Sequence, residues 1–257
     1  MKSIKEVFEY REMIYMLVRK ELRGRYRGSV LGFAWTFLNP LLQLAVYTIV
    51  FSIIMRAGIE KYYIFLFVAL VPWMAIASSV NNGAVCIISQ AGMVTKIYFP
   101  RRILPIVAVS SNFINMLLSM LVVLVVCFFS IGINFSVLWY LIPVSLIEYL
   151  LALGITLLIS GLTVYFRDLE YLAGIFTMAW QFMTPVMYSI DMVPERFMGI
   201  FKLNPMTPVI LAFRQVLYYQ TAPEMGALLR SFLVGLGVLV FGWIIFGRLE
   251  RRFAEVL

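Results

Sequence analysis

Residues that could carry out acid–base chemistry are few in this sequence, and they lie in one short stretch. Arg167, Asp168 and Glu170 fall within YFRDLEYL, residues 165–172, between two apolar runs. Neighbouring carboxylates can act as general acid and base. Three charges at the junction of two helices more often cap a helix and form an ion pair. We therefore expect a structural role for this cluster, with catalysis as the alternative.

Other motifs of catalysis and cofactor binding are missing from the sequence. Histidine is absent, and no GxxxxGK[ST], HExxH, GxSxG or glycine-rich dinucleotide pattern occurs. Cys86 and Cys127 are far apart and do not form a metal-ligand pattern. We therefore expect no catalytic residue, no metal site and no cofactor in this chain, and no ATP binding by the chain itself.

The composition is that of a membrane protein. Of the 257 residues, 63% are hydrophobic and only 13% are charged. A soluble domain could not bury that much apolar surface. The net charge of +8 comes from basic residues that mostly flank apolar runs, which indicates membrane orientation rather than nucleic-acid binding. An N-terminal signal peptide is not expected, because the first apolar run is preceded by a long charged segment and is itself long enough to span a bilayer.

Six apolar stretches reach the length of about 20 residues that a helix needs to cross a bilayer. We therefore predict a single, all-α transmembrane domain over residues 1–257, with both termini in the cytoplasm, because that orientation places most of the 21 Lys and Arg residues inside. The predicted spans are about 31–55, 62–82, 103–131, 137–165, 171–190 and 229–247.

Two further segments are predicted not to cross the membrane. Apolar and charged residues alternate at helical spacing within residues 1–29, which is typical of an amphipathic helix in the headgroup plane. A cytosolic helix is the alternative. Residues 191–228 are apolar but are divided by prolines into pieces too short to cross. Such pieces are typical of re-entrant helices, and a folded outer cap is the alternative.

Glu148 is the one ionisable residue well inside an apolar run. A charge there is costly and is usually turned towards protein or water, so a structural hydrogen bond and a transport role are both open. Aromatic side chains on the first and fifth predicted spans could line a path for sugars, although packing is the simpler role for any one of them. These aromatic residues are Trp35, Tyr47, Trp180, Phe182 and Tyr188.

The segment QAGMVTKIYFPRRILP, residues 90–105, lies on the predicted cytoplasmic side. It carries Lys96, Arg101 and Arg102 without an acidic residue, so it can act as an anchor for membrane orientation. A short helix in this segment could also dock on a cytosolic partner.

These motifs together resemble one family. The basic N-terminal helix leads into YRGSVLGFAWTFLNPLL, and TKIYFPRRILP, YFRDLEYL, TPVMYSIDMVP and LNPMTPVILAFR follow in that order. The combination resembles the permease subunit of type-2 ABC exporters for lipid-linked polysaccharides. Relatives move O-antigen, teichoic acid or capsular polymer across the bacterial inner membrane. The resemblance extends over nearly the whole chain.

The resemblance implies a homodimer with a path lined mainly by the first and fifth spans. Two copies of a separate ABC ATPase, which carry ATP and magnesium, would sit below the dimer. Lipid-linked polysaccharide and membrane lipids would be the other partners, and no nucleic acid is expected. The segment matching the family's coupling helix comprises Met93, Val94, Thr95, Lys96, Ile97, Tyr98, Arg101 and Arg102.

Three arginines near the predicted inner headgroups, Arg23, Arg25 and Arg27, are our candidates to receive the anionic lipid diphosphate. This hypothesis rests on their charge and depth. Three other functions stay open at this point. The chain could be a membrane transferase acting on polyprenyl phosphates, with Asp168 and Glu170 in its site. It could be an ion-coupled carrier that uses Glu148, or an ABC exporter of small molecules.

Overall fold

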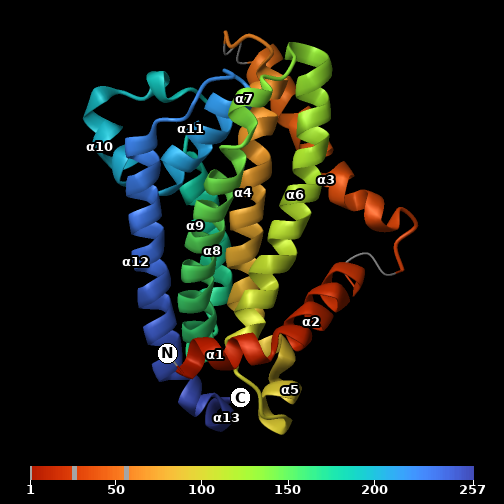
Figure 1. Cartoon of the computed structure of the whole chain (residues 1–257), viewed down its shortest axis with the longest axis vertical. Coiled ribbons are helices and arrows are strands. Elements are labelled where there is room, and N and C mark those ends of the chain that lie inside the picture. The colour runs from red at the N-terminus through yellow and green to blue at the C-terminus, as the bar shows by residue number, and fades with distance from the viewer. Residues whose placement is uncertain (1, 25–27, 55–57) are drawn as a thin grey trace.

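The structure, a computed structural model, describes residues 2–24, 28–54 and 58–257. Over these residues the fold consists of helices and turns, without a strand. The long helices form an upright bundle, and the two termini lie at the same end of it (Figure 1). The predicted all-α fold is confirmed.

Four segments of the described chain are long and apolar enough to cross a bilayer. They are built from α4, Tyr62–Val85; α6, Ile103–Ile131; α7 and α8, Phe135–Leu138 and Leu141–Thr163; and α12, Met225–Leu249. The turn from α6 to α7 is tight because Gly132 has a φ of 77°, a conformation that glycine adopts without steric cost.

Helix α4 is the centre of the bundle. Every residue from Ile64 to Val71 is at most 2% exposed. Helices α3, α6, α8, α9 and α11 all pack on α4. A helix covered on all sides is apolar all round rather than amphipathic, and the unbroken apolar run at its start fits this position.

Close packing of α8 on α12 depends on glycine. A Cβ atom added at Gly154 would lie 2.6 Å from the backbone nitrogen of Leu239, and one added at Gly242 would lie 2.5 Å from the carbonyl oxygen of Gly154. The two backbones therefore touch, as small residues allow in membrane helices.

The first and fifth predicted spans differ from the four long segments. The first consists of the 3-10 turn Gly32–Ala34, α3, Trp35–Thr48, and a π-helical turn, Ile49–Ile54. In the fifth, α9 covers Leu169–Phe182 and then gives way to turns. At 1.5 Å per residue, a 14-residue helix is about 21 Å long, less than a bilayer core of about 30 Å. Helix α9 is thus shorter than the predicted span 171–190, and both that span and the count of six stay predictions.

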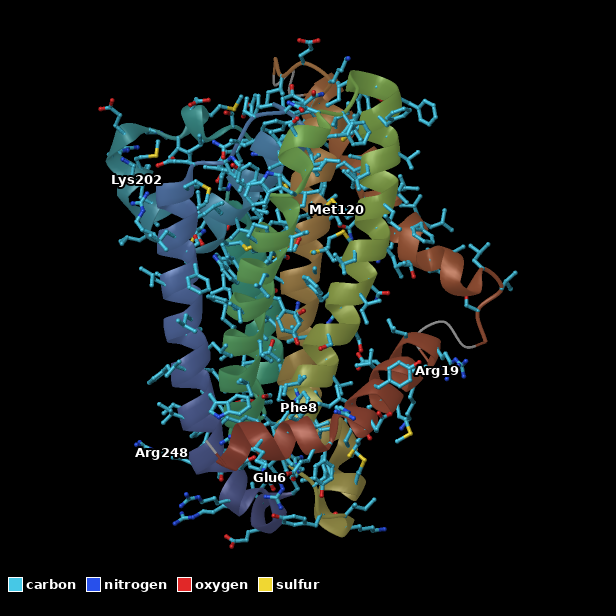
Figure 2. All side chains as sticks on the ribbon, in the orientation of Figure 1. Glu6, Phe8, Arg19, Met120, Lys202 and Arg248 are labelled. Carbon is cyan, nitrogen blue, oxygen red and sulfur yellow. The ribbon has the colours of Figure 1, made fainter. Side chains whose placement is uncertain are left out.

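Short helices cover the two ends of the bundle (Figure 1). At the end with the termini lie α1, Lys2–Glu9; α2, Arg11–Gly24; α5, Ala91–Lys96; and α13, Phe253–Val256. At the other end lie α10, Glu195–Leu203, and α11, Met206–Leu217, within the range predicted to be re-entrant. Among the labelled side chains, Arg248 and Glu6 lie near one end, Lys202 lies near the other, and the apolar Met120 lies between them (Figure 2).

Candidate functional site

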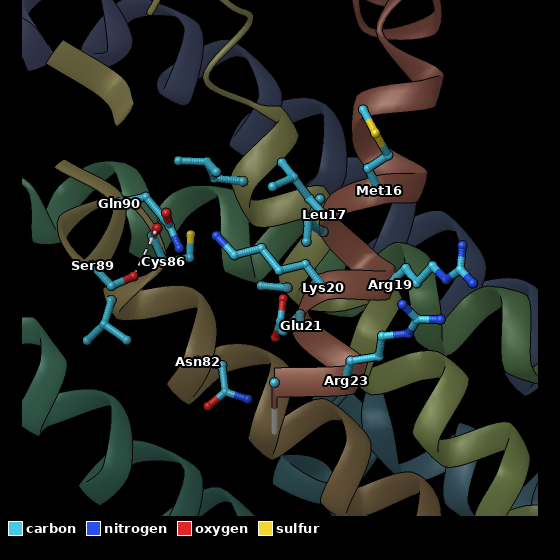
Figure 3. A pocket seen from close by; sticks show the side chains of 15 residues that line it. Met16, Leu17, Arg19, Lys20, Glu21, Arg23, Asn82, Cys86, Ser89 and Gln90 are labelled. Atoms are coloured by element: carbon cyan, nitrogen blue, oxygen red, sulfur yellow. Dashed lines mark hydrogen bonds between the residues drawn. The ribbon is translucent and has the colours of Figure 1, made fainter. Parts of the chain in front are cut away.

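A large cavity lies between the amphipathic helix α2 and the bundle. It has a volume of about 840 Å³ and is lined by α2, the end of α4, the segment after α4 and the start of α6. We call it the headgroup cavity (Figure 3). Its bundle side includes Asn82, Ser89 and Gln90, together with apolar residues such as Leu104 and Val107. The cavity therefore combines an apolar wall with neutral hydrogen-bonding groups.

The charge of the headgroup cavity comes from α2. Arg19, Lys20 and Arg23 line it, with Glu21 as the acidic residue of the lining. Lys20 extends towards Gln90, whereas Arg19 and Arg23 extend in the opposite direction, away from Gln90 (Figure 3). The excess of positive charge suits an anion, and the apolar wall suits hydrocarbon. Of the three predicted substrate arginines, Arg23 lines this cavity, while Arg25 and Arg27 lie outside the described residues.

Cys86 also lines the headgroup cavity and is a free thiol. Burial raises the pKa of this thiol, and the nearby carboxylate of Glu21 raises it further. The thiolate is the reactive form of cysteine. The thiolate form of Cys86 is therefore disfavoured near neutral pH.

The predicted coupling segment contains a short helix with an exposed end. Helix α5 covers Ala91–Lys96 and buries Val94 against the bundle. The residues that follow are open to solvent, with Ile97 at 59% and Tyr98 at 86% exposure. Exposed apolar side chains at a polar end of a membrane protein are typical of a protein contact.

Arg101 and Arg102, predicted to belong to the same docking segment, point instead to the end of α12. Arg102 is 7% exposed; its Nη2 lies 3.1 Å from Oε1 of Glu250, and its guanidinium stacks 4.5 Å from the ring centre of Trp243. Arg101 donates a hydrogen bond from Nη1 to the backbone oxygen of Glu250. The two arginines thus fasten the coupling segment to the last long helix.

The five predicted channel aromatics differ in their exposure, and their role in lining a path stays a prediction. Trp180 is buried; its Nε1 donates to Oδ1 of Asn204 at 2.9 Å, and its ring meets Trp73 edge-on at 5.4 Å. Trp180 therefore serves as packing within the chain. Phe182 is 60% exposed and Trp35 is 36% exposed.

The other two aromatic residues of that prediction are partly buried. Tyr47 packs against the hydrophobic core. Tyr188 donates its hydroxyl proton to the backbone oxygen of Phe182, and its ring lies 6.3 Å from that of Phe201. Both side chains thus make contacts within their own chain.

The charged residues that raised the possibility of chemistry are Glu148 and the cluster Arg167, Asp168 and Glu170. Glu148 is 2% exposed, and within the described part of the chain neither carboxyl oxygen has a hydrogen-bond partner. A structural hydrogen bond, one of its two open roles, is therefore not formed here. Asp168 occupies the first position before α9, but its side chain makes no capping hydrogen bond, and no ion pair joins it to Arg167 among the described residues. The predicted cap was wrong.

Arg214, which sequence reasoning did not single out, organises the end of the bundle opposite the termini. It lies on α11, is 1% exposed and has its guanidinium 3.5 Å from the ring centre of Phe65 on α4. It donates hydrogen bonds to the backbone oxygens of Phe65, Pro185, Val186 and Tyr188. In the sequence, Arg214 could have been noticed only as an arginine within an apolar stretch.

Taken together, these features define a class of protein. The chain is a multi-pass membrane protein with a cationic cavity beside the amphipathic helix α2 and exposed apolar side chains after α5 at the same end. These are features of a transporter subunit.

Comparison with known proteins identifies the family. The family model described as ABC-2 type transporter matches residues 12–218. An O-antigen export system permease protein, RfbA, of Myxococcus xanthus is 32% identical, covering 98% of this chain and 98% of that protein. Two RfbA proteins of Klebsiella pneumoniae are 31% and 32% identical, each over 96% of this chain and 95% of the relative. The chain belongs to the ABC-2 type transporter family. It is a transport subunit rather than an enzyme, and its family implies an ABC ATPase as partner.

Proposed function

We propose that this chain is the transmembrane permease of an ATP-driven exporter of a lipid-linked polysaccharide. The observation that carries the proposal is similarity over almost the full length to permeases named for O-antigen export. The polymer would be an O-antigen or a similar bacterial polysaccharide. ATP and magnesium would be bound by the partner, and this chain would hold no cofactor of its own.

The assembly that we propose contains two copies of this chain and two copies of the ATPase in the bacterial inner membrane. Both termini would face the cytoplasm, together with α1, α2, α5 and α13, which lie at that end of the bundle (Figure 1). Helix α9 supports a dimer: Ala173, Thr177 and Trp180 face the chain's own bundle, while Tyr171 and Ile175 are 74% and 60% exposed. A second copy could cover part of that exposed face.

The headgroup cavity is proposed to receive the lipid end of the substrate. A lipid diphosphate carries negative charge and a long hydrocarbon chain. Arg19, Lys20 and Arg23 supply positive charge at the cavity, and guanidinium groups bind phosphate through paired hydrogen bonds. The hydrocarbon would stay in the membrane beside α2 and α6.

Motion would reach the bundle through the coupling segment. A push by the ATPase on exposed Ile97 and Tyr98 would be passed on through Arg101 and Arg102 to Glu250. From there it would reach α12 and, through the glycine contact, α8. Two helices whose backbones touch move together, because the contact has no flexible side chain to absorb a displacement.

A cellular experiment tests the proposed function. In a strain that lacks this chain, the wild-type protein should restore the polysaccharide to the cell surface. A variant with Arg19→Gln, Lys20→Gln and Arg23→Gln should leave lipid-linked polymer inside the cell. The matched control is Lys202→Gln, which removes an exposed charge at the opposite end of the bundle.

Equal membrane levels of the variants would be checked by immunoblotting. Normal export by the triple variant would contradict the role of the headgroup cavity. The strain without the chain could instead keep normal surface polysaccharide and lose export of a small molecule. That result would contradict a polysaccharide as the substrate.

A further inference from the structure

A second, smaller cavity lies between α3, α4 and α6, and no charged residue lines it. Its volume is about 90 Å³, which is room for roughly three water molecules at about 30 Å³ each. We call it the polar crevice. Its polar lining residues are Thr36, Asn39, Ser78, Asn112, Asn115 and Ser119.

Two residues of the polar crevice have hydrogen-bonding atoms without a partner in the described chain. Thr36 is 4% exposed, and its Oγ1 is unpaired. Both Oδ1 and Nδ2 of Asn115 are buried and unpaired. By contrast, Ser119 donates to the backbone oxygen of Thr36 at 3.2 Å, and Asn112 donates to that of Ala108 at 2.9 Å. An unpaired buried polar group costs about 1–3 kcal/mol, so the crevice is suited to an occupant that forms hydrogen bonds.

The polar crevice adjoins the headgroup cavity. Asn82 and Ala108 line the headgroup cavity, and Ser78 and Asn112, each four residues away on the same helix, line the crevice. Four residues rise about 6 Å along a helix. Nδ2 of Asn82 donates to Oδ1 of Asn112 at 3.4 Å, so an amide pair stands between the two spaces. The two cavities are therefore neighbours, and a ligand that spans both would have to displace or bind this amide pair.

We propose that the polar crevice is a subsite for an uncharged substituent of the sugar nearest the lipid. This inference rests on the proposed function, in which the lipid diphosphate occupies the headgroup cavity. A hydroxymethyl or acetamido group would enter the crevice and bind Thr36 and Asn115. The sugar ring, which is too large for the crevice, would remain at its mouth against Trp35, which also lines it.

The chemistry of the lining selects this occupant over two others. A phosphate would find no cation in the crevice, whereas the headgroup cavity offers three. An acyl chain would leave the polar atoms of Thr36 and Asn115 unpaired. An acetamido group offers both a donor and an acceptor, and Asn115 also presents both. Trp35 donates a hydrogen bond from Nε1 to Oγ of Ser29 at 3.0 Å, which favours its present orientation.

The test compares two probes on the purified chain in lipid nanodiscs. One is a prenyl diphosphate that carries a single N-acetylhexosamine, and the other is the same prenyl diphosphate without sugar. The wild type should bind the sugar-bearing probe about tenfold more tightly. Thr36→Val and Asn115→Leu should each reduce that advantage about threefold, within the range of one hydrogen bond, and leave the affinity for the bare lipid unchanged.

Two further variants serve as controls. Thr163→Val removes a hydroxyl that bonds within its own helix, to the backbone oxygen of Ile159, and should leave the advantage unchanged. Thr36→Ser keeps the hydroxyl and should retain the advantage, so a general packing effect at this position is distinguished from a lost hydrogen bond. Thermal unfolding of each variant checks its fold.

Equal affinity of the wild type for the two probes would overturn the subsite, and the crevice would then hold only water. The proposed function would survive that result, because the bare lipid diphosphate would still bind. Failure of both probes to bind would instead contradict the headgroup cavity and the subsite together.

Discussion

Replacing Arg214 by methionine should destabilise the protein strongly. The guanidinium binds the backbone oxygens of Pro185, Val186 and Tyr188, which follow the end of α9, and that of Phe65. Methionine fills similar space but donates no hydrogen bond. The oxygen of Phe65 lies inside α4 and keeps its helical partner, whereas the other three lose a donor, in a buried place for Pro185 and Val186 and a partly buried one for Tyr188.

The expected magnitude follows from those three oxygens. Each buried acceptor left unpaired costs about 1–3 kcal/mol, and removing the buried charge recovers part of the sum. We expect a loss of roughly 4 kcal/mol, in line with the cost of breaking a buried charged network. For a chain of this size, such a loss lowers the melting temperature by roughly 10 °C.

The assay is thermal unfolding of the purified protein in detergent, followed by intrinsic tryptophan fluorescence. Arg196→Met is the matched control, because Arg196 lies on neighbouring α10 and is exposed. It should shift the melting temperature by at most about 2 °C. Arg214→Lys, which keeps the charge but loses the planar fork, should fall between the two. If Arg214→Met and Arg196→Met melted at the same temperature, the reasoning would be refuted.

Three further predictions concern the packing of α8 on α12, the ion pair of Glu250 and the thiol of Cys86. Gly242→Ala should destabilise the chain by about 1–3 kcal/mol through overpacking against Gly154. Gly237→Ala on the same helix has open space around it and should not destabilise the chain. Thermal unfolding compares the two variants. Glu250→Gln removes the ion pair of Arg102 and should therefore uncouple ATP hydrolysis from export while the complex still assembles. The measurement is the phosphate released per polymer exported. An unchanged ratio would count against transmission of motion from Arg102 to Glu250. Cys86 should react slowly with maleimide at pH 7, because its pKa is raised and little thiolate is present. The reaction should become faster as the pH rises and the thiolate fraction grows. Labelling as fast as that of an exposed thiol would contradict the raised pKa.

Local patterns were enough to predict much of the fold. The apolar runs that became α4, α6, α8 and α12 were found because each is long and nearly free of charge. Prolines and apolar pieces correctly indicated that residues 191–228 hold short helices, which the structure places as α10 and α11. The position of each of these helices depends on residues that are close together in the chain, so it can be predicted from a single sequence.

Contacts between distant residues could not be predicted in this way. Helix α9 ends at Phe182 although the apolar run continues, and the turns beyond it are held by Arg214, about thirty positions further along the chain. The direction of Arg102 was also hidden, because its partner Glu250 lies at the far end of the sequence.

The candidate site illustrates the same limit. Three basic residues near the end of the N-terminal helix pointed to the inner headgroups, and Arg23 does line the headgroup cavity. The cavity's other wall comes from α4 and α6, which no spacing in the N-terminal segment could reveal. The polar crevice combines Thr36, Ser78 and Asn115 from three helices and has no signature in the sequence.

The central claim is that this chain, together with an ABC ATPase, moves a lipid-linked polysaccharide across a membrane. The most direct measurement uses proteoliposomes that contain both proteins and a fluorescent lipid-linked polysaccharide in the leaflet facing the ATPase. We predict that adding ATP and magnesium moves the polymer to the opposite side, and that a non-hydrolysable ATP analogue does not. ATP hydrolysis without movement of the polymer, in vesicles that transport a small molecule instead, would contradict the account.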